Sequence, residues 1–361
     1  MNMTTYGWNE EWHRRWQEGR WPEELEPARI IGDFGSEFEL AAEGGEYRGS
    51  LSGKYRHRLE AGGDYPGIGD WVAVRRPAGS RLLQIEGALP RNSAILRQAA
   101  GTVVSQGQLI AANVDTLFLV AALNDDFNVR RMERYLIMAW NSGAMPVILL
   151  TKADLCEDRE RRIGEMESAA PGVPVHAVSA LRDDGREQLE SYLGPGRTVA
   201  LTGSSGCGKS TVVNWLCGRE LQRTQEVRED DSRGRHTTTH RELFVLPSGA
   251  VLVDTPGMRE LQLRDDEGGL EQAFADIGLL AASCRYADCR HEREEGCAVL
   301  EAAADGRLEE KRLLNFRKTQ RELLYQSAKE QKNKRKAGAA SVKSGSRNAG
   351  RQSWRRDWEE N

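Results

Sequence analysis

This chain of 361 residues lacks a long hydrophobic run and is poor in cysteine. Its best apolar stretch, 109–123, is interrupted by Asn113 and Asp115, whereas a membrane-spanning helix needs roughly 18 apolar residues. The first residues contain no apolar segment of the signal-peptide type, so we expect a cytoplasmic protein with no membrane partner. Six cysteines in a chain of this length do not build a disulfide scaffold.

Composition is otherwise ordinary for a globular protein, with 39% hydrophobic and 29% charged residues, and the length suggests about two or three domains. The charge is unevenly distributed. Residues 331–361 carry nine Lys or Arg against three Asp or Glu, so the preceding residues hold a net charge of −10. This basic, Gly/Ser-rich tail is predicted to be disordered. It favours a polyanionic partner, although a merely solvated tail has the same composition.

The N-terminal extension, residues 1–28, is rich in tryptophan. Trp8, Trp12 and Trp16 recur every four residues, which places them on one face of a helix. We interpret this face as packing on the next domain. A stacking platform for nucleic acid is the alternative.

Residues 29–98 consist of short strand-like stretches separated by glycines, which predicts an OB-type β-barrel. A basic and aromatic cluster, 54–58, is expected beside a loop of this barrel. Such barrels bind oligonucleotides through stacking and basic grooves. A solvated hairpin would explain the cluster equally well.

Residues 99–278 alternate between strand and helix patterns, which predicts an α/β domain with a mostly parallel sheet covered on both faces. A helical domain is expected at 279–330, with apolar positions at helical spacing after residue 306.

A phosphate-binding loop follows the predicted strand 198–201 and precedes a helix. Glycines let the backbone wrap around phosphates, and the helix N-terminus attracts anions. Lys209 is expected to reach the β- and γ-phosphates, and the Ser210 hydroxyl to bind Mg²⁺. The loop comprises Gly203, Ser204, Ser205, Gly206, Cys207, Gly208, Lys209 and Ser210, followed by Thr211.

Two further segments complete the pattern of a nucleotide hydrolase. The apolar strand 251–253 ends in Asp254, a carboxylate suited to Mg²⁺, and Gly257 can bring its backbone N–H against a γ-phosphate. Between them and the phosphate loop, the threonine-rich segment 237–239 offers a hydroxyl for Mg²⁺, for which we select Thr238. An edge strand is the alternative for that segment.

A guanine-recognition motif is indicated upstream by Thr151, Lys152, Ala153 and Asp154. The Asp154 carboxylate can accept hydrogen bonds from guanine N1–H and the 2-amino group, which adenine does not offer together. Thr151 stands where asparagine is usual. Ser179 and Ala180 match a short loop whose backbone contacts the guanine oxygen.

The order of these motifs is unusual, because the guanine motif precedes the phosphate loop. Circular permutation of a GTPase domain explains it, since folds tolerate breaks in exposed loops. With a barrel before it and a Cys/His cluster after it, this order resembles the ribosome small-subunit-dependent GTPase A family over residues 29–325. The resemblance implies a GTPase that binds the small (30S) ribosomal subunit and its rRNA late in maturation. It also implies stimulation by the subunit and departure after hydrolysis of GTP to GDP. We expect a monomer.

The Cys/His cluster consists of Cys284, Cys289, His291 and Cys297. Three thiolates and one imidazole suit tetrahedral Zn²⁺, and a site filled by protein ligands is structural. We therefore expect one structural zinc per chain, and the resemblance agrees.

The attacking water needs a group to orient it, and Met258 stands where many GTPases carry glutamine. His236 is our catalytic candidate, because neutral histidine can accept a hydrogen bond near physiological pH. Arg235 is a lesser candidate for stabilising charge. Two other functions fit parts of the sequence: a transporter- or repair-type ATPase, and an RNA-binding module with a vestigial nucleotide site.

Overall fold

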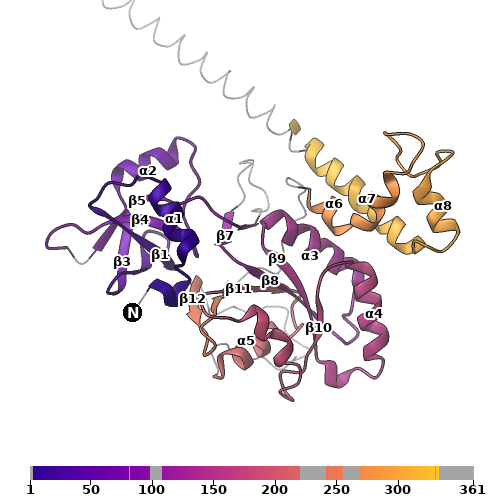
Figure 1. The fold of residues 1–361 in the computed structure, drawn as a ribbon, viewed down its shortest axis with the longest axis horizontal. Coiled ribbons are helices and arrows are strands. Elements are labelled where there is room, and N and C mark those ends of the chain that lie inside the picture. The colour runs from indigo at the N-terminus through magenta and orange to yellow at the C-terminus, as the bar shows by residue number, and fades with distance from the viewer. Residues whose placement is uncertain are drawn as a thin grey trace, which may run out of the picture.

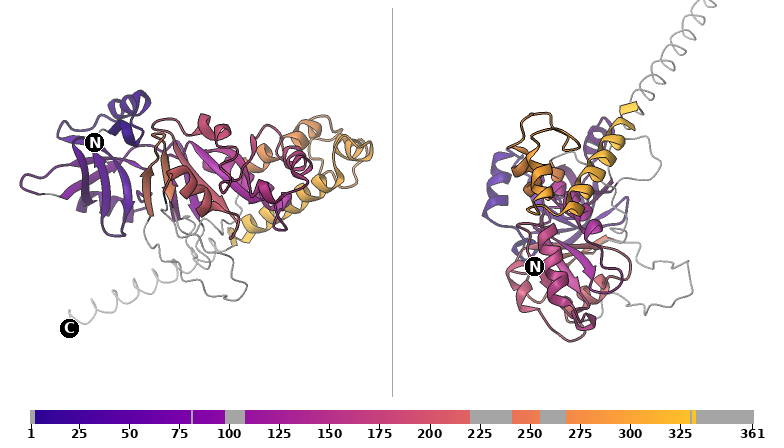
Figure 2. Two further views of the ribbon diagram at one scale, coloured as in Figure 1. Left: turned by 90° about the horizontal axis from the view of Figure 1, so that it is seen from below. Right: turned by 90° about the vertical axis from the view of Figure 1, so that its right-hand side faces the viewer.

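The computed structural model describes residues 3–80, 82–97, 108–219, 241–254, 268–329 and 331–332. They form three units in a row: an N-terminal β-barrel, a central α/β sheet and a C-terminal group of helices (Figures 1 and 2). In these ranges no helix is both long and apolar enough to cross a membrane.

The N-terminal unit is a closed barrel in which strand β1 pairs with β2 on one side and with β4 on the other. The pairing order of its described strands is β1-β2-β3-β5-β4 and back to β1, which confirms the expected OB-type barrel. The strands are β1 (Leu25–Asp33), β2 (Phe38–Ala42), β3 (Gly45–Leu51), β4 (Trp71–Arg75) and β5 (Leu82–Ala88).

The basic cluster of the barrel lies on a helix, α2 (Gly53–Glu60), so the alternative of a solvated hairpin was wrong. Ser52 caps this helix by accepting a hydrogen bond from the Tyr55 backbone N–H at 3.2 Å. Tyr55 and Leu59, one helical turn apart, pack into the barrel core. The basic side chains of residues 54 and 56–58 therefore remain exposed.

The tryptophan-rich extension packs on the barrel, as we interpreted it. It comprises the short helix η1 (Met3–Tyr6) and α1 (Glu10–Glu18). Trp12 is buried, and its ring centroid lies 5.9 Å from that of the buried Trp71 at the start of β4. Because both rings are covered by protein, they have no face to offer to a nucleic-acid base.

The central sheet has the strand order β10-β9-β8-β11-β13-β12, in which all neighbours are parallel except the last pair. The chain proceeds in one direction from β8 to β10 and in the other from β11 to β13. Loops at such a reversal diverge and leave a crevice at the carboxyl ends of the strands, where ligands bind in open α/β sheets. The strands are β8 (Thr116–Ala122), β9 (Met145–Thr151), β10 (Val175–Ala177), β11 (Thr198–Gly203), β12 (Arg241–Val245) and β13 (Val251–Asp254).

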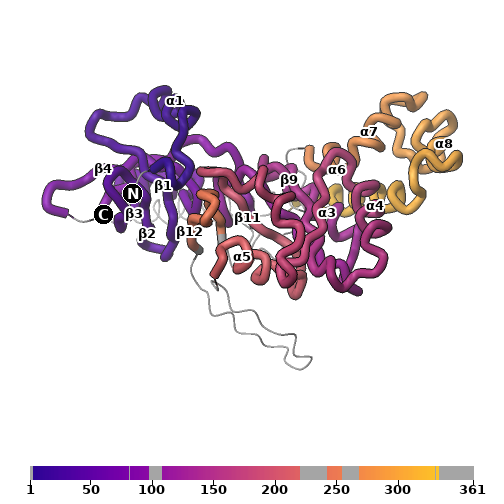
Figure 3. Tube along the Cα trace, turned by 60° about the horizontal axis from the view of Figure 1, so that its bottom comes forward, coloured from indigo at the N-terminus to yellow at the C-terminus, as the bar shows by residue number. Residues whose placement is uncertain are grey.

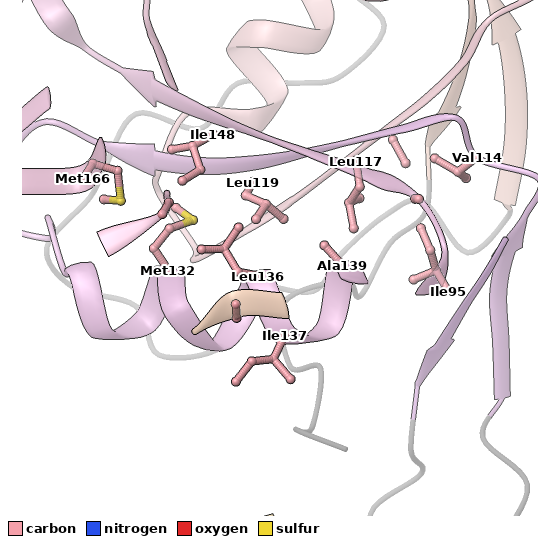
Figure 4. Packing of buried hydrophobic residues seen from close by; sticks show 14 of the residues in the cluster. Ile95, Val114, Leu117, Leu119, Met132, Leu136, Ile137, Ala139, Ile148 and Met166 are labelled. Carbon is pink, nitrogen blue, oxygen red and sulfur yellow. The ribbon is translucent and has the colours of Figure 1, made fainter. Parts of the chain in front are cut away.

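Both faces of this sheet are covered, as the continuous apolar runs of its strands predict. Leu117 and Leu119 of β8 pack against helix α3 (Val129–Ser142) on one face, as Figure 4 shows. Phe118 and Val120 point the other way and share a core with helix α5 (Lys209–Cys217). The remaining described elements around the sheet are η2 (Ala153–Leu155), α4 (Arg159–Ala169) and η3 (Glu187–Tyr192).

The barrel and the central sheet are continuous, because β1 pairs with β12 at Gly32–Glu242 and Asp33–Arg241. A separate ribbon of β6 (Ala94–Arg97) and β7 (Gln108–Ala112) links the two units along the chain. The buried Arg29 of β1 donates to Thr198 Oγ1 of β11 at 2.9 Å and to the carbonyl oxygen of Tyr6 in the extension. One side chain thus joins the extension, the barrel and the sheet.

The C-terminal unit lies at the far end of the molecule from the barrel (Figure 3). It contains α6 (Gly269–Ala273), α7 (Ala275–Ala281), α8 (Ala298–Ala304) and a helix over residues 310–329. Buried Arg312 of that last helix donates to Glu133 of α3 at 3.1 Å and to Asp276 of α7 at 2.6 Å. This buried cation fixes the unit to the central sheet.

Candidate nucleotide site and metal centre

The loop that the sequence predicts to bind phosphate, residues 203–210, lies between β11 and α5, at the point where the sheet reverses direction. Gly203 must be glycine, because a Cβ there would stand 2.2 Å from the Val120 carbonyl oxygen of β8. Gly208 precedes α5 with φ +92° and provides no side-chain cap. The N-terminus of α5, with its backbone N–H groups, therefore faces the loop, which favours an anion.

Lys209 reaches back over the loop. Its Nζ donates to the carbonyl oxygens of Gly203 at 2.8 Å and Ser204 at 2.6 Å. These two bonds hold the ammonium group beside the loop backbone, where it adds positive charge to that of the helix N-terminus.

The proposed guanine motif meets this loop through Thr151, the last residue of β9. Its Oγ1 donates to the Cys207 carbonyl oxygen at 2.5 Å, and Gly208 leaves room for the contact, since a Cβ there would lie 3.3 Å from the same Oγ1. Threonine therefore bridges the two motifs although asparagine is the usual residue. Segments more than fifty residues apart are therefore in direct contact.

Asp154 stands on η2, three residues beyond Thr151. Ser179 Oγ donates to its Oδ1 at 2.6 Å, so the short loop after β10 orients the carboxylate. The side chain is only 11% exposed, and the Arg182 Nε–Asp154 Oδ2 distance is 3.8 Å. Because Arg182 itself is largely exposed, this ion pair is weak and can give way to a ligand.

Of the other predicted site residues, Lys152 and Ala153 continue from Thr151, and Ala153 N donates to the Val178 carbonyl oxygen at 3.2 Å. Ala180 follows Ser179 in the short loop, while Ser205, Gly206, Ser210 and Thr211 belong to the phosphate loop and the first turn of α5. The backbone of β13 ends at Asp254, at the same edge of the sheet. His236, Thr238, Gly257 and Met258 lie outside the described residues.

A contact that the sequence analysis missed connects the loop after β8 to the phosphate loop: Ser204 Oγ donates to Asp126 Oδ2 at 2.7 Å. No sequence signal identifies it, because Asp125 and Asp126 are adjacent residues of one type in a turn.

The predicted metal ligands also come together. The ligand atoms of Cys284, Cys289, His291 and Cys297 all lie within 4.8 Å of one another, and the latter two residues are buried. The shortest separations are 3.4 Å from His291 Nδ1 to Cys297 Sγ, 3.6 Å from His291 Nδ1 to Cys284 Sγ and 3.8 Å between the two sulfurs. A metal ion at the centre could contact all four residues.

The surroundings of this cluster suit a negatively charged metal centre. Two buried nitrogens of Arg317, Nε and Nη2, have no hydrogen-bond partner within the described ranges. Burial lowers the pKa of His291, and although the negative charge of Glu294 opposes this, the positive charge of Arg317 adds to it, so the pKa lies below its ordinary value and the neutral, ligating imidazole is favoured. Three thiolates around a divalent cation carry a net charge of about −1, which Arg317 would offset.

Comparison with known proteins shows the same architecture elsewhere. A family model described as RsgA GTPase matches residues 88–264. "Small ribosomal subunit biogenesis GTPase RsgA 2" of Lactiplantibacillus plantarum is 44% identical over 298 residues, which cover 82% of this chain and 83% of that protein. "Small ribosomal subunit biogenesis GTPase RsgA" of Methanosarcina acetivorans is 44% identical over 322 residues, 86% of this chain and 85% of that protein.

Solved structures agree in fold. The crystal structure of YjeQ from Thermotoga maritima superposes with a TM-score of 0.64 at 27% identity, covering 83% of this chain and 99% of that chain. YloQ, described as a circularly permuted GTPase, gives a TM-score of 0.62 at 22% identity, covering 84% of this chain and 96% of that chain. The permuted arrangement inferred from the motif order is therefore confirmed.

Proposed function

The chain belongs to the RsgA GTPase family, and from this premise we propose that it binds GTP between Asp154 and the 203–210 loop and hydrolyses it during late maturation of the small ribosomal subunit. Family members are GTP hydrolases, and the curated relatives are named for biogenesis of that subunit. We propose that the subunit stimulates the reaction and that hydrolysis to GDP releases the protein from it.

One observation carries this proposal. The hydrogen bond from Thr151 Oγ1 to the Cys207 carbonyl oxygen joins the guanine end of the pocket to its phosphate end. Asp154 follows Thr151 by three residues and the loop N–H groups follow Cys207 directly, so one guanine nucleotide can reach both. An ATPase would have no use for a buried carboxylate oriented by Ser179 at the base end.

We assign three tasks within this site. Asp154 accepts hydrogen bonds from the guanine base, Lys209 and the loop N–H groups bind the phosphates, and Ser210, Thr238 and Asp254 hold Mg²⁺. The hydroxyl and carboxylate oxygens in this set are hard ligands that fit Mg²⁺. When bound, the ion neutralises charge that develops on the phosphate oxygens.

His236 is the proposed group that orients the attacking water. Substitution His236→Ala is expected to slow turnover strongly with little change in the affinity for GTP. An equal loss of turnover and affinity would instead assign His236 to binding.

Zinc is the metal we propose for the Cys/His cluster. For tetrahedral Zn²⁺ with Zn–S of ~2.3 Å and Zn–N of ~2.0 Å, neighbouring sulfurs lie about 3.8 Å apart and nitrogen and sulfur about 3.5 Å apart. The separations among Cys284, His291 and Cys297, 3.8 Å and 3.4–3.6 Å, match these values. Because four protein ligands fill the coordination sphere, the ion has a structural role.

The proposed partner is the small (30S) ribosomal subunit with its rRNA. We propose that the protein binds this subunit in the cytoplasm as a monomer. The exposed basic residues of α2 suit a phosphate backbone, as does the basic segment 331–361. The deciding experiment is GTP hydrolysis by the full chain titrated with purified small subunits, with Lys209→Ala as the inactive control. No increase in turnover at a saturating concentration of subunits would refute stimulation. In a separate experiment, removal of residues 331–361 should weaken the salt dependence with which the protein binds the subunit.

A further inference from the structure

We propose that Asp126, in the loop between β8 and α3, is a positioning residue that holds the 203–210 loop ready for a nucleotide. The inference rests on the proposed nucleotide site and assigns to it a side chain outside all of its sequence motifs.

The contact is made at the second residue of the loop. Asp126 Oδ2 accepts from Ser204 Oγ at 2.7 Å, while the carbonyl oxygen of the same Ser204 accepts from Lys209 Nζ at 2.6 Å. Ser204 therefore connects Asp126 to the lysine that is proposed to bind phosphate. An ionised carboxylate can only accept hydrogen bonds, so the serine hydroxyl must donate and its rotamer is fixed.

This tether matters because the backbone around it is permissive. Gly203 has φ +156° and Gly206 has φ +75°, conformations in which glycine adds little restraint of its own. Between these glycines, the Ser204 side chain attaches the 203–210 loop to the loop that follows β8.

Asp126 is itself held firmly. Arg131 in the first turn of α3 donates to its Oδ1 at 2.8 Å, its Oδ2 at 3.1 Å and its carbonyl oxygen at 3.0 Å. The start of the same loop is fixed by the Leu123 N–H, which donates to the Thr151 carbonyl oxygen at 2.9 Å. The carboxylate is thus positioned from α3 and β9, independently of the phosphate loop.

Charge agrees with this geometry. Burial raises the pKa of Asp126, but hydrogen bonds from Arg131 and Ser204 and the nearby charges of Arg131 and Lys152 outweigh it, so the pKa lies below its ordinary value. The carboxylate is therefore ionised at neutral pH. Asp125, the preceding residue, is exposed. It carries the same charge, but the hydrogen bond to Ser204 is made by Asp126.

The test is the dissociation rate of a fluorescent GDP analogue from the full chain, chased with excess unlabelled GDP. One lost hydrogen bond at the loop corresponds to about 3- to 10-fold faster release for Asp126→Ala. Ser204→Ala should give the same increase, and the double variant should release GDP no faster than either single variant. Asp125→Ala removes an equal charge from the same loop and should release GDP at the wild-type rate.

Asp126→Asn provides the conservative comparison. Its amide oxygen can still accept from Ser204, so release should lie between wild type and Asp126→Ala, and it keeps the side-chain volume if the alanine variant folds poorly. Equal acceleration by Asp125→Ala, or multiplied effects in the double variant, would overturn the inference. Failure of the wild-type protein to bind the GDP analogue would instead refute the proposed nucleotide site, and the inference with it.

Discussion

Replacing Asp154 with asparagine should change which base the pocket prefers. Guanine presents N1–H and a 2-amino group to the carboxylate, whereas xanthine presents N1–H and a carbonyl oxygen. Ser179 donates to Oδ1 at 2.6 Å, so in Asp154→Asn the amide oxygen is expected to keep that place and the NH₂ group to replace Oδ2. An amide in that position repels a 2-amino group and donates to a carbonyl oxygen.

The magnitude follows from the burial of the carboxylate. A hydrogen bond to a charged group contributes about 1.5–3 kcal/mol, and a neutral one about 1 kcal/mol less. Asp154→Asn loses the bond from the 2-amino group and leaves a neutral acceptor for N1–H, which together cost about 2.5–4 kcal/mol, or roughly 10²–10³ in affinity for GDP. The side chain is 11% exposed and thus only slightly accessible to water, but a nucleotide pocket is open to solvent at its mouth. We therefore expect the lower end, about 100-fold.

Competition between unlabelled GDP, XDP and ADP for a fluorescent nucleotide measures this change directly. Asp154→Asn should lose affinity for GDP and gain affinity for XDP, while ADP binding stays weak. Glu157→Gln, an exposed site three residues along, provides the matched control and should behave as wild type. A variant that kept its preference for GDP over XDP would refute the assignment of Asp154 to the base.

Three further predictions concern the rest of the fold. Cys289→Ser should abolish the binding of one zinc per chain in metal analysis and lower the thermal midpoint without altering GDP affinity, whereas Cys156→Ser should retain the metal; zinc bound normally by Cys289→Ser would exclude this cluster. Burial raises the pKa of Glu133 to about 7 although Arg312 opposes the shift, so the folded protein holds a proton that the unfolded chain releases. This group's contribution to the free energy of unfolding is therefore full below its ordinary pKa and falls as pH rises to about 7. Glu133→Gln should remove that slope from thermal denaturation curves; an unchanged slope would contradict the assignment. Arg29→Met should cost about 3 kcal/mol in urea unfolding by leaving Thr198 Oγ1 and buried carbonyl oxygens unpaired, while exposed Arg14→Met should cost almost nothing. Equal stability of the two arginine variants would show that the barrel is held by other contacts.

Much of the fold could be predicted because its signals are local. Each strand or helix of the central unit, the phosphate loop and the set of metal ligands is recognised from residues close together in the chain, so a pattern in the chain becomes a pattern in space. The helix over 53–60 was not predicted because its decisive features, a capping Ser52 and the Tyr55–Leu59 pair, were outweighed by the charge of their neighbours.

Contacts between distant segments could not be predicted in this way. Arg29 meets Thr198 across 169 positions and Arg312 meets Glu133 across 179, and neither arginine differs in its local sequence from exposed ones. Asp126 and Ser204 are 78 positions apart. Only the folded chain shows which of two adjacent aspartates faces the loop.

The pairing of β1 with β12 means that barrel and hydrolase cannot be divided cleanly. A fragment ending between them would leave backbone N–H and C=O groups bare at the end of β1 or along one side of β12, and such edges recruit strands from other molecules. It would also leave the Arg29 guanidinium without its hydrogen-bond acceptor, Thr198 Oγ1. Truncated versions of this protein are therefore expected to aggregate on expression. A chimera that takes its barrel from a relative would also need the β12 sequence of that relative.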